Sequence, residues 1–176
     1  MRLTKTLAAG AVALSALVTL TGCGDDGGAG AEGPMGGLPV AKTMADVQKA
    51  VMERGEDCSP LEQSREGKTY MVDEAKDPAW GIKERAVCFD SSGNSVTVLL
   101  LEDMTKFQES LAKGSGRFTV GQNFALAGTG ESFGQTLNRN GLSMLSCDPD
   151  DRANVPSGYE IQEGKVKGCF TTTYDA

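Results

Sequence analysis

The sequence contains no histidine among its 176 residues. Imidazole is the usual proton shuttle near neutral pH and the base of Ser-His-Asp and Cys-His catalysis, so both kinds of catalytic set are excluded. Zinc and copper sites built on imidazole are excluded for the same reason. An enzyme on this chain would have to use carboxylates from distant segments, such as Glu53 and Glu131, meeting in one pocket.

Basic residues are also in short supply. The chain has 17 Lys and Arg against 24 Asp and Glu, which gives a formal net charge of −7 at pH 7. Binding to nucleic acid depends on basic side chains that neutralise phosphates, so we expect no nucleic-acid partner. A net charge of this size favours solubility and says little about the fold.

The third absence is an apolar run of the roughly 20 residues that a membrane-spanning helix needs. The charge-free apolar stretch Leu7–Leu20 is shorter than that and follows Arg2 and Lys5. A short basic start and a brief apolar run are typical of a secretory signal that is removed after export.

The end of this stretch is more specific. Leu20-Thr21-Gly22-Cys23 resembles the lipobox of prokaryotic membrane lipoproteins, in which an aliphatic residue and two small residues precede a cysteine. The resemblance implies cleavage between Gly22 and Cys23 and attachment of diacylglycerol to the Cys23 thiol. Two acyl chains hold a protein on a bilayer far better than one. We therefore expect a lipid anchor at the outer face of the cell membrane.

Removal of residues 1–22 would leave 15 basic against 24 acidic residues, a net charge near −9. Residues 23–39 contain the lipid site and a glycine-rich segment, in which half of the residues from Gly24 to Gly37 are glycine. Such a composition cannot bury enough apolar surface to offset its ordering entropy, so it predicts a flexible tether. Residues 40–176 have the length of one globular domain.

Four cysteines remain after Cys23. An even number in an exported chain predicts two disulfides, with three possible connectivities among Cys58, Cys88, Cys147 and Cys169. Pairing of sequence neighbours, Cys58–Cys88 and Cys147–Cys169, closes the shortest loops and is preferred. A metal site built from all four thiolates is disfavoured because the chain has no C-x-x-C pair.

The pattern of apolar residues predicts an α+β domain, an antiparallel sheet of about four to six strands with two or three helices packed on one face. Thr43 begins a helix that ends at Gly55, and Asp103 begins another that ends near Gly114. A third, short helix is expected at 131–138. Strands are expected at 84–89, 95–101, 117–120, 123–127, 158–162 and 166–173. The second of these strands is apolar at nearly every position, which favours a central place in the sheet.

Three local patterns could mark a site. Ser110-Leu-Ala-Lys113 matches the S-x-x-K motif of penicillin-binding enzymes, but the companion motifs are missing or out of order, and we expect both side chains on the solvated flank of the helix. Residues 148–151, Asp-Pro-Asp-Asp, could offer oxygen ligands to calcium, although acidic turn residues explain them better. Trp80 could anchor a partner but is expected to pack against the sheet.

The domain resembles small lipoproteins of high-GC Gram-positive, actinobacterial bacteria. The resemblance lies in Arg85-Ala-Val-Cys88-Phe, the Asp103 helix and Gly121-Gln-Asn-Phe124, and covers roughly residues 43–127. It implies an envelope with a single membrane and no particular activity. The expected tether, the expected disulfides and the missing catalytic set predict a monomeric, non-catalytic module without cofactor that binds an unknown protein or envelope ligand. A small histidine-free envelope enzyme that uses carboxylates is the alternative.

Overall fold

The computed structural model describes residues 35–63, 66–128 and 130–174. In chain order the elements are α1 (Met44–Met52), the 3-10 helices η1 (Glu74–Lys76) and η2 (Pro78–Trp80), β1 (Ile82–Phe89), β2 (Ser95–Leu101), α2 (Met104–Leu111), β3 (Phe118–Val120), β4 (Phe124–Gly128), α3 (Glu131–Arg139), β5 (Ser143–Ser146), α4 (Pro149–Ala153), β6 (Ile161–Glu163) and β7 (Phe170–Thr172). None of the helices in these described ranges is long and apolar enough to cross a bilayer.

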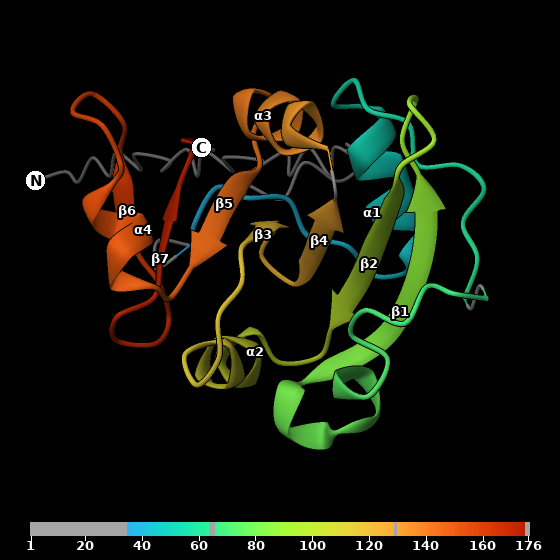
Figure 1. The fold of residues 1–176 in the computed structure, drawn as a ribbon, viewed down its shortest axis with the longest axis horizontal. Coiled ribbons are helices and arrows are strands. Elements are labelled where there is room, and N and C mark those ends of the chain that lie inside the picture. Colours follow the sequence, from blue (N-terminus) through green and yellow to red (C-terminus); the bar gives the residue numbers. More distant parts are fainter. Residues whose placement is uncertain (1–34, 64–65, 129, 175–176) are drawn as a thin grey trace, which may run out of the picture.

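The strands form one sheet in the order β1-β2-β4-β3-β5-β7-β6, and every neighbouring pair is antiparallel. Figure 1 shows this order from β1 on the right to β6 on the left. The α+β class and the antiparallel sheet are confirmed. The strand number is seven rather than four to six because β5 was not predicted, and α4 is a fourth helix.

Strand β2 lies inside the sheet, paired with β1 and β4, and its residues from Val96 to Leu101 are all buried. Val96, Val98 and Leu100 pack with the apolar side of α1 and with Leu137 of α3. Leu99 and Leu101 pack on the other side with Phe107 of α2. The expectation that all helices cover one face is therefore wrong: α2 lies opposite α1 and α3, as a strand that is apolar on both sides requires.

The start of α1 follows from its sequence. The Thr43 hydroxyl accepts a hydrogen bond from the Asp46 amide at 3.2 Å, and the Asp46 carboxylate accepts one from the Thr43 amide at 2.8 Å. This capping box satisfies amides that the first helical turn leaves without partners. Met44, Val47 and Val51 then face the sheet, as their helical spacing predicted.

Both preferred disulfides are present. Cys58 pairs with Cys88 at a Cα–Cα distance of 4.9 Å, and Cys147 pairs with Cys169 at 3.9 Å. Cys88 is in β1, whereas Cys147 follows β5 and Cys169 precedes β7. Local pairing therefore brings together segments that the sheet already places near each other.

The packed part of the chain begins earlier than residue 40. Met35 is 1 % exposed and belongs to the core on the α2 side, and Leu38 packs against the same core. The Pro39 carbonyl accepts a hydrogen bond from the Gln122 amide at 2.9 Å. Residues 35–39 were expected to be tether; Met35 is buried and Leu38 is half-buried, so their apolar side chains attach this segment to the core. The motif Leu20–Cys23 and the rest of the expected tether lie outside the described residues.

Candidate functional site

A cavity among the described residues lies where η1 and η2 meet the beginnings of β1 and α2. One wall is the short helix η2, and its own residues determine where it begins and ends. The Asp77 carboxylate accepts a hydrogen bond from the Ala79 amide at 2.8 Å, and Pro78 occupies the first position of η2, where no amide is needed. Gly81 then ends η2 in the left-handed conformation, with φ of 61°.

Gly81 also fixes the floor of the cavity. Its carbonyl accepts hydrogen bonds from the amides of Glu102 at 2.9 Å and Asp103 at 3.1 Å. A Cβ atom at position 81 would lie 2.5 Å from the Asp103 carbonyl oxygen, closer than any real side chain can come. Both the backbone conformation and this close approach require glycine.

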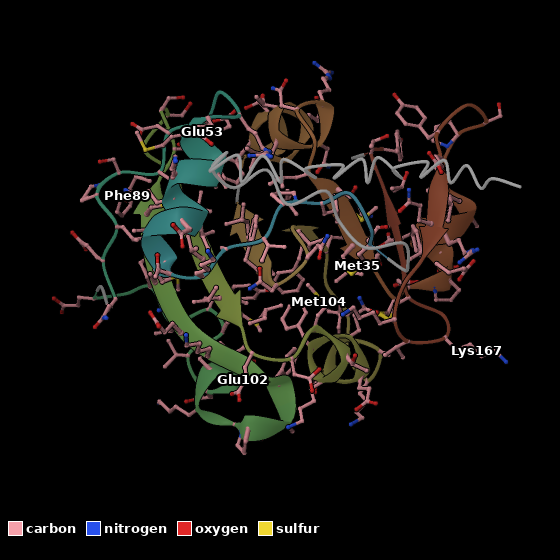
Figure 2. All side chains as sticks on the ribbon, turned by 180° about the vertical axis from the view of Figure 1, so that it is seen from behind. Met35, Glu53, Phe89, Glu102, Met104 and Lys167 are labelled. Carbon is pink, nitrogen blue, oxygen red and sulfur yellow. A yellow bond between two sulfur atoms is a disulfide. The ribbon has the colours of Figure 1, made fainter. Side chains whose placement is uncertain are left out.

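The opposite wall is the first turn of α2. Asp103 caps this helix, because one of its carboxylate oxygens accepts hydrogen bonds from the amides of Thr105 at 2.9 Å and Lys106 at 3.2 Å. Met104 points inward from the same turn (Figure 2), and Lys106 points to the exposed side.

Between these walls lies a solvent-open groove of about 400 Å³. Lys76 at its edge forms an ion pair with Asp73 at 3.1 Å, and both side chains are largely exposed. The lining therefore combines two ammonium and two carboxylate groups with the apolar side chains of Ala75, Pro78 and Ile82. The lining residues are Ala75, Lys76, Pro78, Gly81, Ile82, Glu102, Asp103 and Lys106.

The groove is supported from behind by α2. The Ser110 hydroxyl donates a hydrogen bond to the Ala79 carbonyl at 3.0 Å, and Trp80 meets the Phe107 ring edge-on with centroids 6.0 Å apart. Ser110 is buried, so its expected place on the solvated flank is wrong; the hydroxyl is turned inward because η2 packs there and offers an unpaired carbonyl. Trp80 is half-buried against an apolar cluster that contains Phe107 of α2 together with Leu99 and Leu101 of β2.

Comparisons of the chain with protein-family models, with curated proteins and with solved structures found no match.

The acidic segment 148–151 forms the first turn of α4. The Asp148 carboxylate accepts a hydrogen bond from the Asp150 amide at 2.9 Å. Asp151 forms an ion pair with Arg117 at 2.7 Å and accepts a hydrogen bond from the buried Ser146 hydroxyl at 2.6 Å. No group of three or more His, Cys, Asp or Glu within the described part of the chain is placed to hold a metal ion. These carboxylates cap a helix and attach it to β5.

Four carboxyl groups of the described residues have a pKa that differs clearly from the ordinary value, and in all four it is lowered. Burial raises the pKa of Asp151, but hydrogen bonds from Ser146 and Arg117 outweigh burial and leave the pKa below its ordinary value. Asp90 behaves in the same way: burial opposes its ionisation, and hydrogen bonds from Asn94 and from the backbone of its hairpin turn lower the pKa. A carboxylic general acid needs the opposite displacement.

The other two displaced carboxyl groups also have a lowered pKa and lie on the surface. A side-chain hydrogen bond from Thr43 lowers the pKa of Asp46, and a hydrogen bond from Arg152 lowers that of Glu163. Glu53, the first member of the hypothetical catalytic pair, is exposed and lies 3.8 Å from Lys49. The side chain of its suggested partner, Glu131, lies outside the described residues.

Gln108 is the polar residue that sequence reasoning missed. It is 0 % exposed on α2, and its carboxamide joins two distant segments. The only signal in the sequence was its place directly after Phe107 in the apolar face of the helix, where a polar residue needs buried partners.

Proposed function

We propose that this protein is an exported lipoprotein, anchored through Cys23 to the outer face of the cell membrane, and that it acts there as a non-catalytic binding module. The observation that carries the anchor is the charge-free stretch that ends in Leu20-Thr21-Gly22-Cys23. The two disulfides support an address outside the cytosol, because such bonds persist in oxidising compartments.

The groove between η2 and α2 is the binding site that we propose. Its floor is fixed by Gly81 and its wall by the Asp103 cap, so a ligand would meet a preformed surface. The four carboxyl groups with a lowered pKa lie outside the groove, in capping, turn and ion-pair contacts, so they serve the fold.

Mass spectrometry of the mature N-terminus tests the anchor. We expect a chain that begins at Cys23 and carries diacylglycerol on its thiol. A Cys23→Ala variant should remain unprocessed or be released from the membrane fraction. An unmodified wild-type N-terminus, or an intact leader on a secreted protein, would overturn the proposal.

Crosslinking in intact cells tests the groove. A photoreactive residue replaces Lys106 at the groove wall, and the same residue replaces Lys49 on α1 as the matched control. We expect an adduct from position 106 that Glu102→Gln weakens, and none from position 49. Equal adducts at both positions, or none at position 106, would exclude the groove as the binding site.

A further inference from the structure

At the end of the sheet that carries β6 and β7, the Gln108 side chain links the turn before β7 to the start of the packed chain, and Met35 and Val166 pack in the same apolar cluster. The Gln108 amide nitrogen donates to the Met35 sulfur at 3.2 Å, and the Gln108 amide oxygen accepts from the Val166 backbone amide at 3.0 Å. A Cβ atom on Gly164 would lie 2.7 Å from the same oxygen. The turn 164–168 therefore lies beside the point where the chain arrives from the predicted anchor.

This turn is basic in an otherwise acidic protein. Its sequence is Gly164-Lys165-Val166-Lys167-Gly168, and both lysines are exposed. Figure 2 shows Lys167 projecting outward, while Met35 lies in the interior. The nearest carboxylate along the chain, Glu163, is already paired with Arg152. The turn itself contains no acidic residue, so both of its ammonium groups are exposed to solvent without a carboxylate beside them in the turn.

The distance from Met35 to the lipid site is limited by the chain. Met35 follows Cys23 by twelve residues, and a stretch of that length spans at most about 43 Å when fully extended. A molecule anchored at Cys23 would therefore keep Met35, and the turn beside it, within about 43 Å of the lipid site.

We propose that Lys165 and Lys167 form a membrane-docking surface for anionic phospholipid headgroups, which sets the orientation of the domain on the bilayer. This inference rests on the proposed lipid anchor. A lysine near an anionic surface favours the bound state by about fivefold. Because the chain as a whole carries a net charge of −7 and such headgroups repel it, we expect the basic turn to be the part of the β6–β7 end that approaches them.

Lysine labelling of the mature, lipidated protein in vesicles tests the proposal. One set of vesicles contains phosphatidylcholine alone, and the other also contains phosphatidylglycerol. An amine-reactive reagent modifies exposed lysines, and mass spectrometry reads each position. Lys83 on β1, at the opposite edge of the sheet, is the internal control.

We expect labelling of Lys165 and Lys167 to fall at least fivefold in the anionic vesicles only, and to recover in 1 M salt, where the screening length is only about 3 Å. Labelling of Lys83 should stay constant. In a Lys167→Gln variant, the protection of Lys165 should weaken about fivefold, whereas Lys83→Gln should leave it unchanged. Equal labelling of the turn in both vesicle types would overturn the docking surface.

Flotation of the same samples separates the two proposals. Protein that floats with both vesicle types but shows no protection of the turn keeps the anchor and refutes the docking surface. Protein that floats with neither type refutes both.

Discussion

Replacement of Gln108 measures how much one buried carboxamide contributes to the fold. In Gln108→Ala, the Val166 amide loses its partner and a space opens between α2, Met35 and the turn. The lost hydrogen bond, the unpaired amide and the cavity together predict a loss of about 3 kcal/mol in the free energy of unfolding. Gln108→Met keeps the volume and removes only the polar contact, so it should lose about 1–2 kcal/mol.

Urea unfolding of the oxidised protein measures both values, and hydrogen exchange of the Val166 amide reports on the contact directly. We expect faster exchange at Val166 in both variants. Gln162→Ala, which alters an exposed glutamine on β6, is the control and should change stability by less than about 0.5 kcal/mol. A Gln108→Met variant as stable as the wild type, with unchanged exchange at Val166, would refute the reasoning.

Three further predictions concern single contacts. Thr43→Ala removes half of the capping box and should destabilise the domain by about 1 kcal/mol in a denaturant titration; an unchanged midpoint would contradict the cap. Replacement of both Cys147 and Cys169 by Ser opens a loop of 22 residues and should lower the free energy of unfolding by about 3–4 kcal/mol. Equal stability of the reduced and the oxidised wild type would contradict this. The pKa of Asp151 is lower in the folded state, so the stability that its carboxylate contributes is complete above its ordinary pKa of 3.8 and is lost as the pH falls through the lower, folded value. Asp151→Asn should therefore be less stable than the wild type at neutral pH and should lose less stability on acidification below about pH 4. Parallel curves of stability against pH for the two proteins would contradict this.

The sequence was most informative where local chemistry and burial agree. The first helix could be predicted because Thr43 and Asp46 begin it and three apolar residues share one face. The hairpin of β1 and β2 could be predicted because the turn between them carries Gly93 and Asn94, and Gly93 has φ of 79°. Local disulfide pairing was predicted correctly for the same reason, since short loops bring neighbours together.

It was least informative where an element depends on its neighbours. Strand β5 has only four residues and no clear alternation, and it exists because β3 and β7 pair with it on both sides. The sequence could not predict that α2 covers the face of the sheet opposite α1 and α3, because the apolar side of a helix does not tell which face of the sheet it packs on. The groove depends on the meeting of η2 with α2, segments more than twenty residues apart. Helix α4 was missed although the sequence carries a signal for it: Asp148 is a cap, and Pro149 follows it at the first helical position.

The two crosslinks have a mechanical consequence. One holds β1 to the loop before it, and the other ties the end of β5 to the start of β7, so neither crosses the middle strands. Between β4 and β3 only two residue pairs are in register. An unfolded but oxidised chain keeps two small closed loops, one from each end of the sheet, so the middle strands separate and pair again without any thiol chemistry.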